Sequence, residues 1–153
     1  MYLYFKRSEF AQPAGYGFPR TEYPEEWWTD PTRGGALIPV LDMIREAIGE
    51  PLLIQPGGGL RTEAYNDAMY RSIRQKPTKS QHIPGRAADI RAKTLPVATL
   101  YRTVNKLISI GTIKVGGVGY YPSKGFVHID VRSRPKGTGT ARWTSTSKHK
   151  SNT

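Results

Sequence analysis

Apolar residues recur at steps of three and four in three stretches of the chain, which is the spacing of one face of a helix. The first stretch spans about residues 35–48 and is followed by Gly49, a residue suited to a helix C-cap. The second spans about residues 63–73, and Thr62 precedes it as an N-cap. The third spans about residues 96–108. We therefore expect three helices.

Short apolar runs lie between and after these helices and predict strands. They cover residues 51–55, 87–90, 118–121 and 126–131, and the last two flank a Pro-Ser-Lys-Gly turn that is typical of a hairpin. The chain contains no internal repeat. Helices that alternate with short strands and end in a hairpin predict an α+β domain, in which the helices pack on a small antiparallel sheet.

The two ends of the chain differ from this middle part. Residues 1–35 are rich in aromatic residues, Gly and Pro but have no sustained period, so we expect an irregular N-terminal segment. Trp27 and Trp28 in this segment suit the cap of a small core better than the lining of a ligand groove, because their large area favours burial. We assign residues 1–133 to a single domain.

Residues 134–153 are dominated by Gly, Thr, Ser, Lys and Arg, and no acidic residue follows Asp130. Trp143 is the only large apolar residue among them. Such a composition buries too little surface to offset the entropy of ordering. We therefore predict a basic C-terminal tail that is disordered over about its last ten residues.

Composition narrows the possible functions. The 153 residues suit one domain, and the absence of cysteine excludes disulfides and thiolate metal sites. The net charge of +11 favours anionic partners such as nucleic acid, an anionic membrane surface or a bacterial cell wall. Neither a signal peptide nor a membrane span is recognisable, so we expect a protein made in the cytoplasm without a transmembrane segment.

Two short stretches carry the candidate chemistry. Residues 80–89 contain His82 and, seven residues later, Asp89, with a Pro-Gly turn between them. Residues 126–131 place His128 and Asp130 on the same face of a strand, because side chains alternate along a strand. Two histidines and a carboxylate from two separate elements are a common ligand set for a catalytic zinc ion. An amphipathic strand that happens to carry His and Asp is the simpler alternative.

The same residues resemble a known family. The run Ser80-Gln81-His82-Ile83-Pro84-Gly85-Arg86-Ala87-Ala88-Asp89 is similar to the pattern Ser-x-His-x-x-Gly-x-Ala-x-Asp of the zinc D-Ala-D-Ala peptidases. That group includes D,D-carboxypeptidases, D,D-dipeptidases and the L-alanyl-D-glutamate endopeptidases of phage endolysins, and its fold is shared with the hedgehog signalling domain. Residues 126–130 resemble its Val-His-x-Asp strand, and residues 60–66 resemble its Arg-Ser/Thr-x-x-Tyr-Asn segment.

The resemblance implies roles for individual residues. It makes His82, Asp89 and His128 ligands of Zn²⁺, with a water molecule in the fourth position. It makes Arg61 a group that holds a substrate carboxylate or the developing oxyanion, with a surface ion pair as the alternative. The remaining candidates for substrate binding are Ser80, which could instead cap a local turn, and Tyr65 and Tyr120, which could instead pack in the fold.

The general base is the one departure from the family pattern. Many members carry Glu or Asp three residues before the last histidine, where this chain has Gly125. Asp130 is the natural substitute, because it lies on the same strand face as His128. It could equally be the partner that orients a histidine ligand.

The resemblance therefore implies a phage-type zinc peptidase that hydrolyses peptide bonds in bacterial peptidoglycan. We expect a monomer, although the sequence does not fix the oligomeric state. The bond, L,D or D,D, and the mode, endopeptidase or carboxypeptidase, stay open. We expect peptidoglycan stem peptides and the anionic cell wall as partners, in phage lysis or in a virion. A non-catalytic wall- or virion-associated binding module with the same fold is the alternative. Specific nucleic-acid binding ranks last, because the basic excess is greatest in an aromatic-poor tail.

Overall fold

The computed structural model describes residues 2–145. Four α-helices, one 3₁₀ turn and five strands make up the described chain. In order they are η1 (Arg7–Phe10), α1 (Glu25–Thr29), α2 (Gly34–Ile48), β1 (Leu52–Ile54), α3 (Glu63–Ser72), β2 (Ala87–Ala92), α4 (Val97–Ser109), β3 (Gly117–Tyr121), β4 (Phe126–Asp130) and β5 (Ala141–Thr144). The three predicted helices correspond to α2, α3 and α4, and the predicted strands to β1–β4. No helix of residues 2–145 is long and apolar enough to cross a membrane.

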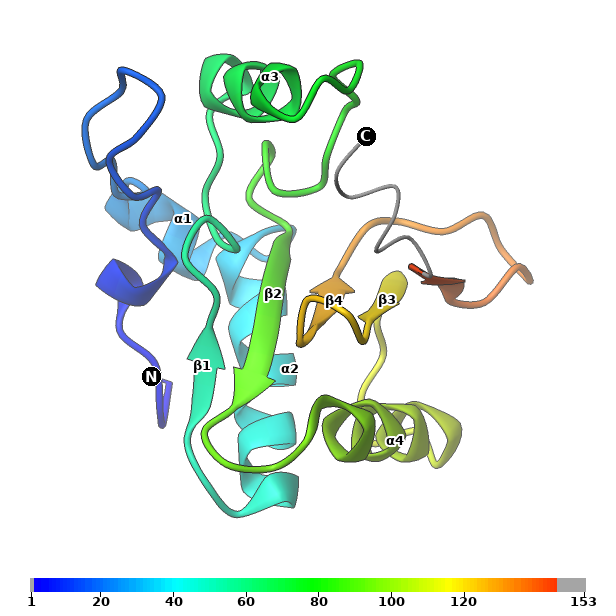
Figure 1. Ribbon diagram of the computed structural model, residues 1–153. Coiled ribbons are helices and arrows are strands. Elements are labelled where there is room, and N and C mark those ends of the chain that lie inside the picture. Colours follow the sequence, from blue (N-terminus) through cyan, green and yellow to red (C-terminus); the bar gives the residue numbers. More distant parts are fainter. Residues whose placement is uncertain (1, 146–153) are drawn as a thin grey trace.

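The five strands form one sheet in the order β1-β2-β4-β3-β5 (Figure 1). The first four strands are antiparallel to their neighbours, as predicted. The fifth pairs with β3 in parallel, so the α+β fold is confirmed but its sheet is mixed. A parallel partner could form here because residues 131–140 lead from Asp130, which pairs with Gly117 on one side, to Ala141, which pairs with Gly117 on the other side.

The presence of β5 corrects the predicted domain boundary. Residues 134–153 were expected to form a tail outside the domain, yet Ala141–Thr144 belong to the sheet. Ala141 and Trp143 alternate with the exposed residues Arg142 and Thr144, and main-chain pairing with β3 holds the strand. The domain therefore continues at least to Thr144. The disorder predicted for the end of the chain falls on residues 146–153, outside the described residues.

One face of the sheet is apolar and is covered by helices α2 and α4 (Figure 1). Alternate residues of the central strands point into this core, among them Ile90 of β2, Val118 of β3, and Val127 and Ile129 of β4. The residues between them therefore point to the opposite face. That face carries Asp89 of β2 and His128 and Asp130 of β4. The apolar residues on the other face anchor these two strands in the core.

The N-terminal segment packs beneath the loop that carries the first histidine. Trp27 is fully buried, as predicted for a core residue, and stacks on Tyr23. Its indole Nε1 donates to the carbonyl of Gly85 at 2.7 Å, and the Tyr23 hydroxyl donates to the carbonyl of His82 at 3.1 Å. A side chain at Gly85 would collide with the Trp27 ring. The aromatic residues of this segment thus fix the turn of the Ser80–Asp89 motif.

The capping predictions are also confirmed. Thr62 is the N-cap of α3, and its hydroxyl accepts from the backbone N–H of Tyr65 at 3.2 Å. Gly49 ends α2 in the left-handed conformation. Thr62 thus sets where α3 begins, and Gly49 sets where α2 ends before β1.

Candidate metal centre

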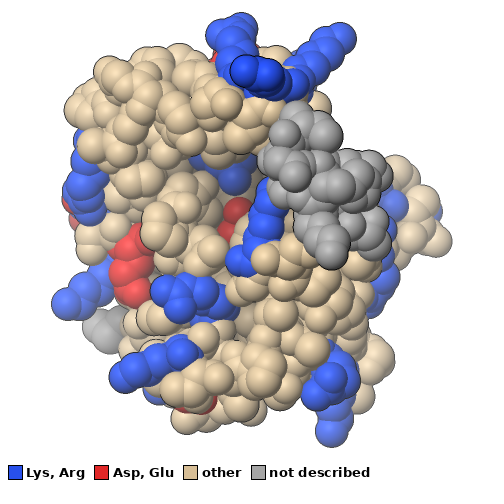
Figure 2. All heavy atoms as spheres, in the orientation of Figure 1, with Lys and Arg blue, Asp and Glu red and all other residues tan. Residues whose placement is uncertain are grey.

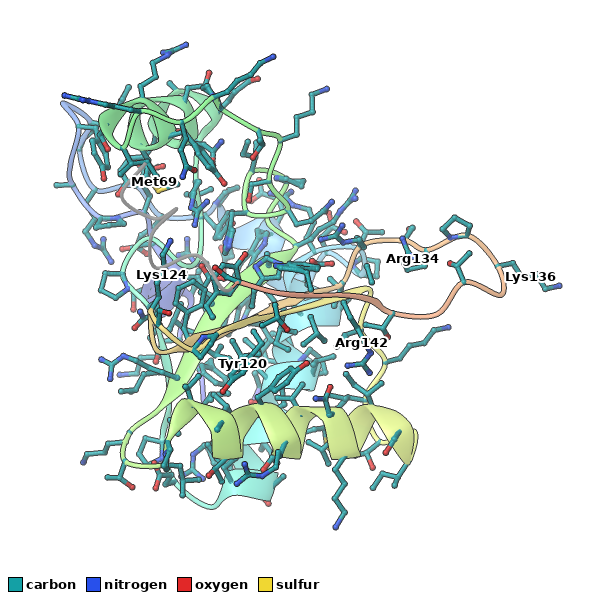
Figure 3. All side chains as sticks on the ribbon, turned by 45° about the vertical axis from the view of Figure 1, so that its right-hand side comes forward. Met69, Tyr120, Lys124, Arg134, Lys136 and Arg142 are labelled. Carbon is teal, nitrogen blue, oxygen red and sulfur yellow. The ribbon has the colours of Figure 1, made fainter. Side chains whose placement is uncertain are left out.

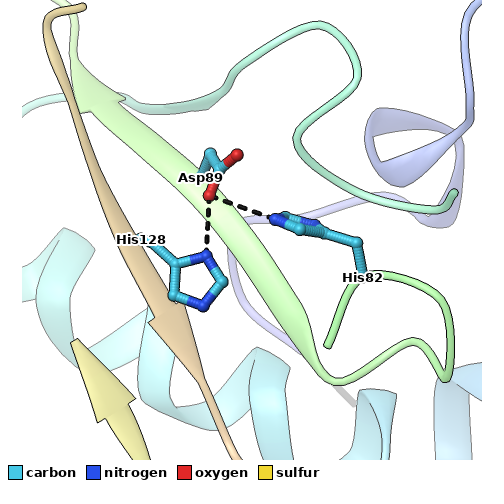
Figure 4. Close-up of side chains that lie close together, drawn as sticks. All are labelled: His82, Asp89 and His128. Atoms are coloured by element: carbon cyan, nitrogen blue, oxygen red, sulfur yellow. Dashed lines mark hydrogen bonds and ion pairs between the residues drawn. The ribbon is translucent and has the colours of Figure 1, made fainter. Parts of the chain in front are cut away.

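Three titratable side chains meet on the open face of the sheet (Figure 4). Asp89 of β2 and His128 of β4 are direct partners across the antiparallel pair, so the register alone brings them together. His82 comes from the loop before β2, which the N-terminal aromatic residues hold in place. All three side chains are buried, and one potential ligand atom of each lies within 4.8 Å of the others. The structure therefore assembles the three residues that the sequence singled out as metal ligands.

The atoms that converge here are hydrogen-bond acceptors. Asp89 Oδ1 lies 3.2 Å from His82 Nε2 and 3.0 Å from His128 Nδ1. The other nitrogen of each ring faces an acceptor as well, because His82 Nδ1 lies 2.9 Å from the carbonyl oxygen of Gly59 and His128 Nε2 lies 2.8 Å from Asp130 Oδ2.

A neutral imidazole carries its proton on one nitrogen only. Donation to Gly59 and to Asp130 therefore leaves a lone pair on His82 Nε2 and on His128 Nδ1, and both lone pairs point at the Asp89 carboxylate. Three acceptors that face one another require a cation between them, either an additional proton or a metal ion.

The acid–base properties of the cluster follow from its burial and its charges. Burial lowers the pKa of His82, although Asp89 acts in the opposite direction. Burial opposes ionisation of Asp89, but the two histidines outweigh it and hold the pKa of this carboxyl well below its usual range. At His128, burial is outweighed by the hydrogen bonds to Asp130 and Asp89, which raise the pKa. An ionised carboxylate beside a neutral His82 is a suitable environment for a metal cation.

The donor set and its spacing fit zinc. Bonds of about 2.0–2.1 Å in a tetrahedral arrangement separate two ligand atoms by about 3.3 Å. The separations of 3.0 and 3.2 Å from Asp89 Oδ1 are close to that value. Within residues 2–145, the cluster consists of three protein ligands. This number matches a catalytic zinc site, which keeps one position open, rather than a closed structural site.

Asp130 is placed behind His128 rather than in front of it. Its carboxylate is fully buried and accepts from three donors. Oδ2 lies 2.8 Å from His128 Nε2 and 2.6 Å from Arg132 Nη2, and Oδ1 lies 2.8 Å from Arg132 Nε. It does not line the cavity in front of the three ligands. Gly117 leaves room for this carboxylate, because a Cβ there would lie 2.4 Å from Asp130 Oδ2. Of the two predicted roles, the geometry favours the one that orients the histidine.

Arg61 also lies against the ligands. Its Nη2 is 3.6 Å from Asp89 Oδ2, the oxygen that does not face the histidines. Its Nε donates to the carbonyl of Gly57 at 2.9 Å and its Nη1 to Asn66 Oδ1 at 3.3 Å. The side chain is only 12% exposed, so the alternative of a surface ion pair is wrong. Three protein partners hold the guanidinium, and its edge still lines the cavity.

The cavity in front of the ligands has a volume of about 620 Å³. Ser80 and Tyr65, two of the predicted substrate-binding residues, line it. The Ser80 hydroxyl also accepts from the backbone N–H of His82 at 3.1 Å, which is the alternative role of a local cap. Tyr120 does not line the cavity. Its ring stacks on Tyr101 of α4 at 4.2 Å between centroids, on the other side of the sheet (Figure 3).

Five aromatic residues of the cavity were not predicted from the sequence: Tyr16, Tyr70, Tyr121, Phe126 and Trp143. Alternation along β3 could have identified Tyr121: Gly119 pairs with His128, so Tyr121, two residues later, lies on the His128 face and Tyr120 on the other. Trp143 gave no comparable signal, because its segment was interpreted as a tail. Its ring centroid is 5.2 Å from that of His128.

The comparisons with known proteins agree with this site. The sequence model of the family described as peptidoglycan L,D-endopeptidase MepK matches residues 36–135, about two thirds of the chain, including all three candidate ligands. The chain is also similar to a probable peptidoglycan L,D-endopeptidase MepK from Haemophilus influenzae, with 33% identity over 73 residues. The aligned part is 48% of this chain and 36% of that relative, so the chain spans about a third of the relative's length. No solved structure matches the chain.

Proposed function

We propose, from the premise that this chain belongs to the peptidoglycan L,D-endopeptidase MepK family, that it is a zinc-dependent peptidase that hydrolyses peptide bonds in bacterial peptidoglycan. The convergence of three acceptor atoms, with no donor between them, carries this proposal. His82, Asp89 and His128 would hold the metal ion. When bound, zinc would supply a Lewis acid for the scissile carbonyl and lower the pKa of a water molecule towards neutrality.

The surrounding residues would position these ligands. The Gly59 carbonyl keeps the proton of His82 on Nδ1, and Asp130 keeps the proton of His128 on Nε2. Each ring is then left with a lone pair on its metal-facing nitrogen. Arg61 would hold the free oxygen of Asp89, so that the carboxylate offers Oδ1 to the metal. We therefore assign Asp130 and Arg61 first to positioning, and Arg61 also to contact with substrate.

The charge of the cavity supports an acidic peptide as the substrate. Four basic residues line it, and Asp89, which is engaged by the two histidines and Arg61, is its only acidic lining residue within residues 2–145. The four are Arg61, Lys79, Lys124 and Arg132. Basic side chains also project at several points of the face shown in Figure 2. Such a cavity attracts peptides with free carboxylates, and peptidoglycan stem peptides carry several.

The family match supports L,D-endopeptidase activity over D,D-peptidase or carboxypeptidase activity, which the sequence analysis left open. Action at the anionic cell wall follows from this substrate. The phage origin and the monomeric state stay predictions.

The alternative is a wall-binding module that keeps the metal but does not cut. Gly125 favours it, because this position cannot supply a general base and Asp130 is turned away from the cavity. The two functions differ in whether the substrate is consumed.

The test measures zinc by mass spectrometry of the metal and product release by chromatography of defined muropeptides. Dimers with an L,D cross-link and dimers with a D,D cross-link serve as separate substrates. We expect about one zinc per chain and cleavage of the L,D dimer, with both lost in His128→Ala. Zinc binding together with muropeptide binding but no product would establish the module instead. A protein that binds no zinc would overturn the proposal.

A further inference from the structure

Strand β5 delivers Trp143 to the metal cavity. The strand runs parallel to β3, and Trp143 pairs with Gly119, which in turn pairs with His128. Three neighbouring strands thus place Trp143 and His128 on the same face, on either side of Gly119. Only glycine fits at position 119 beside this indole, because a Cβ there would lie 2.4 Å from Trp143 Nε1. The indole therefore lies across the backbone of β3, beside the candidate ligand.

The polar end of this indole is used within the cavity. Trp143 Nε1 donates to the hydroxyl oxygen of Tyr121 at 2.9 Å. An indole N–H can only donate, so the tyrosine oxygen is the acceptor and its own proton must point elsewhere. Within residues 2–145, no hydrogen bond of the structure takes this proton. Both residues line the metal cavity, into which the hydroxyl can donate.

The Tyr121 ring is fixed in place. It stacks on Phe126, its direct partner on β4, with 4.5 Å between centroids. On the same face, Tyr121 is the diagonal neighbour of His128, a relation in which the backbone positions are about 7–8 Å apart and an aromatic side chain spans the gap. Burial raises the pKa of Tyr121, so the hydroxyl keeps its proton in the neutral range. A rigid ring with a proton directed by its neighbour is a preorganised donor.

We infer that the Tyr121 hydroxyl, oriented by Trp143, donates a hydrogen bond to the oxygen of the scissile carbonyl as that oxygen gains negative charge. This inference rests on the proposed peptidase function. Tyr121 would be a catalytic residue, because it contacts the reacting atom, and Trp143 a positioning residue that acts through it. A preorganised donor in a partly dry site is worth on the order of 10²-fold in kcat when it is removed.

The matched pair of variants is Tyr121→Phe and Tyr120→Phe. Each removes one hydroxyl from neighbouring residues of β3, but Tyr120 faces α4 and not the cavity. For zinc-loaded Tyr121→Phe we expect kcat to fall by on the order of 10²-fold, with KM changed by less than about twofold. Zinc affinity and the melting temperature should stay unchanged, because the ring stack on Phe126 remains. For Tyr120→Phe we expect wild-type kinetics.

Trp143→Phe tests the orienting role. It keeps an aromatic ring beside His128 but loses the N–H, so we expect a smaller loss of kcat, roughly tenfold, as fits a lost orientation rather than a lost donor. The double variant Tyr121→Phe/Trp143→Phe should be no slower than Tyr121→Phe, because the indole acts only through the hydroxyl. Full additivity of the two losses would overturn the coupling.

A binding experiment separates this inference from the peptidase function. A phosphinate pseudopeptide mimics the tetrahedral, negatively charged state, and its affinity for the zinc-loaded full chain is measured by calorimetry. We expect Tyr121→Phe to weaken phosphinate binding by about the factor lost in kcat, with product-peptide binding unchanged. Dependence on Tyr121 would support the inference even if wild type cleaved no muropeptide. Equal phosphinate affinity in the two proteins, no phosphinate binding at all, or lost zinc affinity in Tyr121→Phe would overturn it.

Discussion

Replacing Asp130 by Asn tests whether this residue holds His128 or acts as the general base. The two carboxylate oxygens have different partners: Oδ1 accepts from the backbone N–H and Nε of Arg132, whereas Oδ2 accepts from His128 Nε2 and Arg132 Nη2. An amide has one acceptor and one donor, so it cannot satisfy both sides. With its NH₂ at the Oδ2 position, the proton of His128 would move to Nδ1, where a metal ion should bind. With its NH₂ at the Oδ1 position, it would face the donors of Arg132.

Either arrangement weakens metal binding. Loss of an outer partner of a ligating histidine costs about 10–100-fold in affinity, which corresponds to about 1.4–2.7 kcal/mol. We expect this loss for zinc in Asp130→Asn, measured by competition with a chromophoric chelator at pH 7. Asp42→Asn is the control, because Asp42 is also buried but lies on α2 and accepts from the backbone of Leu3. Unchanged zinc affinity together with lost cleavage would refute the positioning role and make Asp130 the base.

Three further predictions concern stability and wall binding. Gly59→Ala should destabilise the fold by about 1–3 kcal/mol in denaturant unfolding, because a Cβ would lie 2.4 Å from the backbone oxygen of Phe10; an unchanged midpoint would contradict this close packing. Glu50→Gln should be less stable than wild type at pH 7, because hydrogen bonds from Thr94 and then Leu95 lower the pKa of Glu50 from its ordinary 4.5. A carboxyl with a lowered pKa stabilises the fold above pH 4.5, so the difference in stability should disappear as the pH falls below 4.5. A difference that does not depend on pH would argue against the ionised carboxylate. Arg134→Glu combined with Lys136→Glu, on the loop that projects between β4 and β5 in Figure 3, should weaken binding to purified sacculi at low salt and converge with wild type at high salt. Arg102→Glu combined with Lys106→Glu on α4 is the control with the same change of net charge, and equal effects of the two double changes would reduce the attraction to net charge alone.

The ligand set could be predicted from the sequence because its geometry is local. Asp89 and His128 lie on strands whose alternation of polar and apolar residues fixes the face of each side chain. His82 precedes Asp89 by only seven residues, and the segment between them contains a Pro-Gly turn. In each case, the residues that define the local conformation are close in sequence to the functional residue. The same stretch of sequence therefore predicts both the local structure and the side chain that it presents.

The role of Asp130 and the fifth strand depend on contacts between distant segments. The sequence gives Asp130 the same face as His128, but only the structure shows that the carboxylate is directed at Nε2 and Arg132. Residues 141–144 alternate apolar and polar residues, but four positions in a Gly-, Thr- and Ser-rich segment are too few to indicate a strand, and this one is held by main-chain bonds to β3. Trp143 was consequently assigned to a tail, so its hydrogen bond to the Tyr121 hydroxyl could not be predicted.

The hairpin between β3 and β4 explains why no acid stands at position 125. Gly125 has a φ of 78°, and its N–H closes the turn by donating to the carbonyl of Tyr121 at 2.8 Å. A Cβ would meet nothing within 4 Å, so space is not the obstacle. The left-handed backbone is, because it costs an L-residue roughly 1–2 kcal/mol. A chain that closes this turn with glycine must find its polar catalytic groups elsewhere on the same sheet face, and the positions of β3 on that face are Gly117, Gly119 and Tyr121. Two of these make room for Asp130 and Trp143, which leaves Tyr121 as the residue of this strand able to act on a substrate.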